Sequence, residues 1–148
     1  MLKMAEEVLY RKTFTVKGGD FDKAGDVSTQ IKSILKSTGI SNEIIRRVAI
    51  ASFEAEMNVV LYADEGTVDF VLTPRDVIIT VADKGPGIED IELAMQEGYS
   101  TASDEMREMG FGAGMGLPNI KKTSDELEIN SVVGEGTVVK ITIHLDQT

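Results

Sequence analysis

The sequence predicts an α/β fold in which a β-sheet carries helices on one face. Several segments alternate apolar and polar residues, as strands with one buried face do. Two segments after the first strand instead repeat apolar residues at helical spacing. The order is strand, two helices, then strands interrupted by helices, which favours a two-layer sandwich. With 148 residues and no linker or repeat, residues 1–148 are expected to form a single domain.

The expected elements follow in chain order. A strand over residues 8–16 precedes a helix that Asp20 is expected to cap and that ends near Thr38. A longer helix over residues 43–63 begins after Ser41 or Asn42. The later elements are two strands within 67–83 joined by a turn at 74–76, a short helix at 89–97, a polar loop at 98–109, a helix at 116–124 and a hairpin within 126–145.

Composition excludes several classes of protein. The formal net charge of −10 argues against a nucleic-acid partner, because phosphate backbones require a basic patch. No run of 18 apolar residues is present and the first residues lack a signal-peptide pattern, so no membrane association is expected. The absence of cysteine excludes disulfides and thiolate metal sites, and agrees with a cytoplasmic location.

The helix over residues 43–63 is apolar nearly all round, which is typical of a buried helix. Glu54 and Asn58 lie four residues apart within it and therefore on one face. A partly exposed face with an incidental Glu–Asn pair is one interpretation; Glu56 is expected to be such an ordinary residue. In the other, the Asn58 amide oxygen binds Mg²⁺ and the Glu54 carboxylate takes a proton from a water or hydroxyl. The spacing alone does not decide.

Two glycine-containing stretches follow. "DKGPG" places Asp83 at a strand end, where it is suited to accept a hydrogen bond from an exocyclic amine such as that of adenine, although a simple Gly-Pro turn is equally compatible. "GFGAGMGL" has glycine at every second position from Gly110 to Gly116 and precedes a helix, an arrangement that favours phosphate binding by backbone amides. It matches neither a Walker A loop nor the dinucleotide fingerprint, and a flexible loop is the alternative.

The hydrophilic stretch between these two, "EGYSTASDEMREM", is bounded by Gly98 and Gly110. Its few anchoring residues favour a mobile lid, in which Arg107 is positioned to pair with a terminal phosphate. A solvated acidic loop is the alternative interpretation.

Together and in this order, "EAEMN", "DKGPG", "GFGAGMGL" and the late "GEGT" resemble the four nucleotide-binding boxes of the GHKL ATPase/kinase superfamily over roughly residues 40–143. The resemblance implies the Bergerat fold, a two-layer α/β sandwich of a mixed sheet with helices on one face. The chain is most similar to the small branch of bacterial anti-sigma factors and switch-protein serine/threonine kinases. A histidine-bearing dimerisation helix is not expected before the domain, and His144 is expected to be a surface side chain on a strand.

The resemblance also implies roles for individual residues. Glu54 matches the general base that activates the attacking hydroxyl or water, Asn58 the Mg²⁺ ligand, and Asp83 the carboxylate that reads adenine. Gly87 and Thr137 complete a water-bridged set around the base, and Gly85 and Gly87 admit the ring. The implied ATP-binding residues are Asn58, Asp83, Gly85, Gly87, Thr101, Arg107, Gly110, Gly112, Gly114, Gly116 and Thr137.

The resulting expectation is a kinase that binds Mg·ATP and phosphorylates a STAS-type anti-anti-sigma partner. A nucleotide-gated binding protein that holds a sigma factor or a PP2C-type phosphatase is the second hypothesis. A catalytic domain of a histidine-kinase-like system and a simple ATPase are further alternatives. Both monomers and homodimers are compatible with the resemblance.

Overall fold

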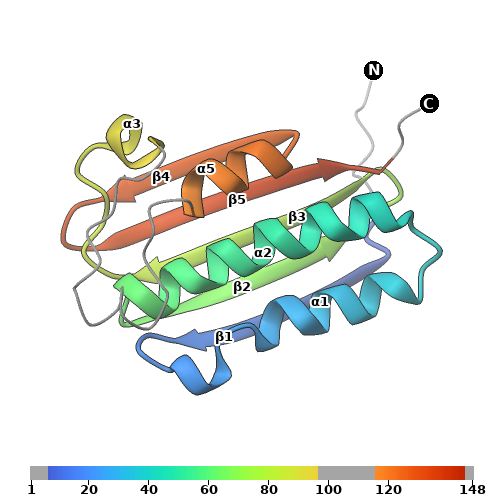
Figure 1. Ribbon diagram of the computed structural model, residues 1–148, viewed down its shortest axis with the longest axis horizontal. Coiled ribbons are helices and arrows are strands. Elements are labelled where there is room, and N and C mark those ends of the chain that lie inside the picture. The colour runs from blue at the N-terminus through green and yellow to red at the C-terminus, as the bar shows by residue number, and fades with distance from the viewer. Residues whose placement is uncertain (1–6, 97–115, 146–148) are drawn as a thin grey trace.

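In the computed structural model, residues 7–96 and 116–145 are described. Their strands form one five-stranded sheet in the order β1-β2-β3-β5-β4, and α1, α2 and α5 cover one face of it (Figure 1). The expected two-layer sandwich with helices on one face is therefore confirmed. The elements are β1 Tyr10–Lys17, the 3-10 helix η1 Phe21–Lys23, α1 Asp26–Lys36, α2 Asn42–Tyr62, β2 Glu65–Leu72, β3 Asp76–Lys84, α3 Ile91–Ala94, α5 Gly116–Thr123, β4 Glu126–Val132 and β5 Gly136–His144.

The strand pairing differs from the expected mixed sheet, because every pairing described is antiparallel. Between β1 and β2 the chain runs out along α1 and back along α2, so β2 begins beside the end of β1, where Lys17 pairs with Glu65. Two hairpins supply the β2–β3 and β4–β5 pairings. The two α-helices α1 and α2, one running out and one back, thus take the place of the single crossover that a parallel pair requires.

The core lies between the sheet and the helices. Alternate residues of the central strands are buried, so apolar side chains line up in rows across the sheet. Phe70, Ile79 and Ile141 form one such row through the pairings Phe70–Ile79 and Ile79–Ile141, and all three are fully buried. Val71 and Ile78, which pair on the opposite face, remain partly exposed. Burial of one face fixes the register, because a one-residue slip would expose the whole row.

Helix α2 lies between α1 and α5 across the middle of the sheet (Figure 1). Ser41 caps its first turn by accepting a hydrogen bond from Ile44 N at 3.4 Å, as expected. Of its 21 residues, 11 are buried, which explains its apolar composition. None of the helices within the described ranges is long and apolar enough to cross a membrane.

The start of α1 contradicts two sequence-based expectations. Asp20 makes no capping hydrogen bond, and α1 begins only after Gly25, at a φ of +96°. The cap comes from Glu56 of α2, whose carboxylate accepts hydrogen bonds from Gly25 N, Val27 N and Ser28 N at 3.0, 3.3 and 3.0 Å. Glu56 is only 1% exposed, so its assignment to a partly exposed face was wrong. A buried carboxylate is stable there because the helix N-terminus supplies both donors and a favourable dipole.

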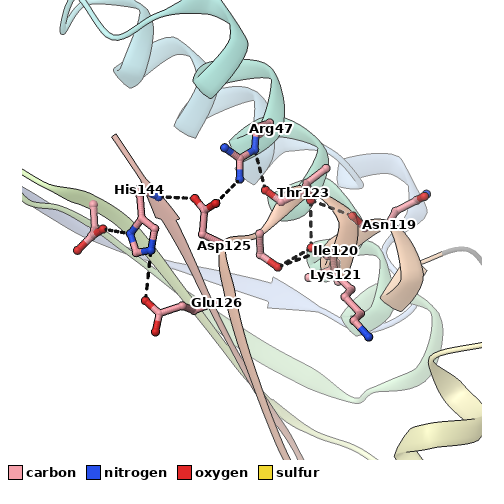
Figure 2. Close-up of polar contacts among 10 residues, drawn as sticks. Arg47, Asn119, Ile120, Lys121, Thr123, Asp125, Glu126 and His144 are labelled. Carbon is pink, nitrogen blue, oxygen red and sulfur yellow. Dashed lines mark hydrogen bonds and ion pairs between the residues drawn. The ribbon is translucent and has the colours of Figure 1, made fainter. Parts of the chain in front are cut away.

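A second polar cluster joins α2, α5 and β5 (Figure 2). Arg47 on α2 donates to Thr123 O at 3.0 Å and pairs with Asp125 at 3.1 Å. Asp125 also accepts a hydrogen bond from His144 N at 2.7 Å. Burial acts to raise the pKa of Asp125, but the His144 N–H and Arg47 outweigh it, so the pKa is lowered. The cluster fixes the C-terminal end of α5 to both layers.

His144 lies at the end of β5 with its side chain 45% exposed, in agreement with the expected strand surface position. Its Nδ1 lies 2.6 Å from Asp76 Oδ1, and its Nε2 lies 3.6 Å from Glu126 Oε2. The hydrogen bond with Asp76, aided by the charges of Asp125, Asp76 and Glu126, raises the pKa of His144. The protonated imidazolium is thus favoured in the folded state.

Replacing Glu56 tests the buried cap. In Glu56→Gln the side-chain amide offers three backbone donors only one oxygen and no charge. We therefore expect the free energy of unfolding to be about 2 kcal/mol lower than that of the wild type. Urea denaturation measures this difference. Glu43→Gln, an exposed position in the first turn of the same helix, is the matched control and should lose no more than about 0.5 kcal/mol. Equal losses in the two variants would contradict a capping role.

The His144 pairing predicts a dependence of stability on pH. Because the folded-state pKa is raised, the stabilisation is fully present below the ordinary pKa of 6.5 and is lost as pH rises through the folded value. The difference in urea midpoint between wild type and His144→Gln should therefore shrink from about pH 5.5 to about pH 9. Since the sequence contains one histidine, NMR titration of the imidazole gives its pKa without ambiguity. A folded-state value below 6.5 would refute the prediction.

Candidate functional site

Glu54 and Asn58 lie one turn apart on α2, half-buried, as their spacing predicted. Both side chains meet α5. Glu54 Oε2 accepts a hydrogen bond from Asn119 Nδ2 at 2.6 Å. Gly116 lies so close to Asn58 that a Cβ added there would be 3.1 Å from Asn58 Oδ1. The start of α5 is therefore built against the two polar side chains of α2.

Sequence reasoning missed Asn119. A lone amide in a short helix carries no periodic or compositional signal, and its partner Glu54 lies 65 residues away. One signal was present in the spacing: Asn119 follows Gly116 by three residues and therefore shares its helix face. Gly116 itself was expected only to bind phosphates through its backbone amide, so this signal was not used.

Asp83 lies near the end of β3 and is half-buried. Its Oδ1 accepts a hydrogen bond from Thr137 N at 3.1 Å, which joins two of the predicted site residues. Burial raises the pKa of Asp83, and the Thr137 N–H offsets this only in part. A carboxylate held by one backbone donor in a half-buried place retains acceptor capacity for a further N–H group.

The two glycines of "DKGPG" have structural reasons. Gly87 has a φ of +76°, and a Cβ there would lie 2.5 Å from Val132 O in β4. A Cβ at Gly85 would lie 3.0 Å from the Cα of Ala63, the residue after α2. Without side chains, the segment after β3 fits between the β4–β5 hairpin and the end of α2. Asp83 is thereby held beside the helix that carries Glu54 and Asn58.

Ser131 on β4 is a second residue that sequence reasoning missed. Its hydroxyl lies 2.8 Å from Thr137 Oγ1, accepts a hydrogen bond from Ile88 N at 2.7 Å and lies 3.2 Å from Gly136 O. It ties the segment after Gly87 to Thr137 on β5. A serine in a hairpin strand has no distinguishing pattern in the sequence, so only the fold reveals this role.

The described residues thus contain two clusters beside α2. Glu54, Asn58 and Gly116 form one, and the other contains Asp83, Gly85, Gly87 and Thr137. The remaining predicted site residues lie outside the described ranges: Thr101, Arg107, Gly110, Gly112 and Gly114. The first cluster, a carboxylate beside an amide, is chemically suited to phosphates with a cation. The second cluster, a carboxylate beside glycines, is suited to a flat ring that carries an amine.

Comparison with known proteins agrees with this arrangement. Serine/threonine-protein kinase RsbT of Bacillus subtilis is 33% identical over 113 residues, which cover 74% of this chain and 79% of that protein. An anti-sigma F factor of Caldanaerobacter subterraneus is 34% identical over 108 residues, covering 70% of this chain and 72% of that protein. The names of these relatives agree with the function expected from the sequence, a switch-protein kinase or anti-sigma factor.

The fold also has a solved counterpart. A crystal structure of the RsbU and RsbW domains of a Mycobacterium tuberculosis protein superposes on 93% of this chain with a TM-score of 0.59 and 16% identity, and the match covers 33% of that longer chain. Residues 36–147 match the model of the family described as histidine kinase-, DNA gyrase B-, and HSP90-like ATPase. The superfamily that the four motifs indicated is confirmed, and the chain belongs to the histidine kinase-, DNA gyrase B- and HSP90-like ATPase family.

Proposed function

We propose that this chain is an ATP-dependent serine/threonine protein kinase that phosphorylates a STAS-type anti-anti-sigma partner in a partner-switching system. The observation that carries the proposal is the half-buried Glu54 carboxylate, held by Asn119 at 2.6 Å and one helical turn from Asn58. The serine/threonine kinase and the anti-sigma factor among its relatives support the same activity.

Glu54 has the position that a general base needs. In the proposed reaction the acceptor hydroxyl oxygen bonds to the γ-phosphorus, its proton passes to Glu54, and the bond to ADP breaks. Such transfer depends mainly on positioning and on neutralising charge, so one base is enough on the protein side. Glu54 also lines an open groove of about 430 Å³ between α1 and α2, which gives a hydroxyl a route to the carboxylate.

The Asn58 side chain and the neighbouring Gly116 fit a magnesium ion. The amide oxygen is a hard ligand, and Mg²⁺ bound to nucleotide phosphates takes few protein ligands. Gly116 leaves room beside this oxygen, since a Cβ there would lie 3.1 Å from it. Asn58 would hold the ion, which supplies neutralisation of phosphate charge when bound.

Asp83 is proposed to read adenine. Its carboxylate accepts from Thr137 N and has acceptor capacity for the exocyclic amine of the ring, while Gly85 and Gly87 present bare backbone beside it. Guanine carries a carbonyl oxygen where adenine carries this amine, so the same carboxylate would repel it. Selectivity for ATP over GTP follows from this one group.

A second candidate is a binding protein whose nucleotide state controls capture of a sigma factor or a PP2C-type phosphatase. The anti-sigma factors among the relatives favour it, and the two roles are compatible in one chain. A cytoplasmic location belongs to the same proposal, and both a monomer and a homodimer are compatible with it. A pull-down that is insensitive both to Glu54→Ala and to removal of ATP would favour binding alone.

The kinase proposal predicts that Glu54→Ala abolishes phosphoryl transfer and spares nucleotide binding. General bases contribute about 100- to 10,000-fold, so labelled product should fall at least about 100-fold. Lysate of the source organism is incubated with γ-labelled ATP, Mg²⁺ and either protein, and a labelled band of small-domain size is expected with wild type alone. Loss of ATP binding together with transfer would show that Glu54 is structural. No band with wild type, despite measured ATP binding, would favour the binding protein.

The adenine proposal predicts that Asp83→Asn weakens ATP binding by about 10-fold or more, because a hydrogen bond to a charged acceptor is replaced by a weaker one. GTP affinity should change little or improve, so the preference for ATP narrows. Calorimetric titration with both nucleotides measures this. Asp64→Asn, an exposed carboxylate nearby in the chain, is the control and should retain the wild-type preference. An unchanged ATP:GTP ratio in Asp83→Asn would place the base elsewhere.

A further inference from the structure

Asn119 restricts how the Glu54 carboxylate is oriented. The bond from its Nδ2 to Glu54 Oε2 is 2.6 Å long, a short distance that is typical of an acceptor carrying charge. Both residues are half-buried. A glutamate side chain has several rotatable bonds, so a carboxylate on a helix surface samples several orientations unless a partner fixes it. Within the described residues only Oε2 is held in this way, so Oε1 is the carboxylate oxygen with no hydrogen bond from this part of the chain.

Helices α2 and α5 are joined at two points, and this determines where Asn119 lies. Arg47 of α2 binds the Thr123 carbonyl at the C-terminal end of α5 (Figure 2). Seven residues along α2, Glu54 binds Asn119, which precedes Thr123 by four residues on α5. Spacings of seven and four keep the contacts on one face of each helix. Because the order of the contacts is reversed between the helices, they run antiparallel, with Arg47 fixing one end and the Glu54–Asn119 bond the other.

We propose that Asn119 is a positioning residue for the base: by holding Glu54 Oε2 against α5, it directs Oε1 toward the acceptor hydroxyl. This inference rests on the proposed kinase function. Misorientation of a catalytic group by a small distance is enough to reduce a rate by orders of magnitude. Asn119 therefore acts on the rate of transfer and leaves nucleotide binding unchanged, since within the described ranges its side chain bonds to Glu54 and to neither Asn58 nor Asp83.

The experiment uses ATP itself as the probe, with water in the acceptor position. Single-turnover hydrolysis of γ-labelled ATP with Mg²⁺ is measured for wild type, Asn119→Ala, Asn119→Asp and Lys121→Ala, an exposed residue of the same helix that serves as control. We expect Asn119→Ala to lower the rate about 10- to 100-fold with nucleotide affinity within about two-fold of wild type. Lys121→Ala should match wild type, and circular dichroism melting shows whether each variant is folded.

The Asn119→Asp variant separates positioning from a merely structural role. In this variant the carboxyl group introduced at position 119 lies beside that of Glu54, and the two share a proton and titrate as a coupled pair. While the proton is shared, the introduced carboxyl group keeps a hydrogen bond with Glu54; once the proton leaves, the two charges repel and Glu54 turns away. The pH–rate profile should therefore gain a descending limb that wild type and Asn119→Ala lack. A structural role alone would lower the rate without changing the shape of the profile.

Two outcomes would overturn the inference, and both differ from failure of the kinase proposal. If Glu54→Ala abolishes hydrolysis while Asn119→Ala stays within about two-fold of wild type, the base is confirmed and the positioning role is wrong. An Asn119→Asp profile without the added limb also contradicts it. If wild type binds ATP but neither hydrolyses it nor labels a protein band in the lysate assay, the kinase function fails first, and the inference fails with it.

Discussion

The fold depends on one constraint: 11 of the 21 residues of α2 are buried, so the charged side chains on its covered faces need partners from neighbouring elements. Glu56 meets this need at the start of α1, where three backbone N–H groups bind its carboxylate. Arg47 binds the Thr123 carbonyl at the C-terminal end of α5. Glu54 binds Asn119, which lies nearer the start of α5. Unpaired, the fully buried Glu56 would cost several kcal/mol by general estimates for buried charge, and the half-buried Arg47 and Glu54 would cost less. The polar contacts of α2 therefore determine where both flanking helices lie.

The second cluster obeys a different constraint, the close approach of backbone to backbone. A Cβ at Gly136 would collide with the carbonyl of Asp83, and one at Gly87 with the carbonyl of Val132. The end of β3 and the β4–β5 hairpin therefore come together only where side chains are missing. This contact brings Thr137 N to the Asp83 carboxylate. The glycines of these motifs thus have a structural role, positioning the Asp83 carboxylate, that does not depend on a ligand.

Much of the fold was predictable, because burial of one sheet face imposes alternation on β2, β3 and β5, and because the N-cap of α2 is local. The positions of Glu54 and Asn58 on one helix face followed from their spacing. Pairings over long sequence distances were not predictable. The cap of α1 comes from Glu56, which follows the capped residues by 28 to 31 positions in the chain. The antiparallel pairing of β1 with β2 arises because α1 and α2 between them run in opposite directions. Asn119 was missed for the same reason, since a single amide identifies no partner.

Glu54 and Glu56 show why residue type alone does not assign chemistry. They lie two residues apart on one helix, yet their directions differ enough that Glu56 meets α1 and Glu54 meets α5. In Glu56 both oxygens are engaged, Oε1 by Ser28 N and Oε2 by Gly25 N and Val27 N, in a place that is 1% exposed. Such a carboxylate is inaccessible to a substrate proton, and three of its about four acceptor sites are occupied. Glu54 is half-buried, lines a groove and has one oxygen engaged among the described residues. The number of occupied lone pairs and the access to the remaining ones therefore distinguish a structural carboxylate from a candidate base.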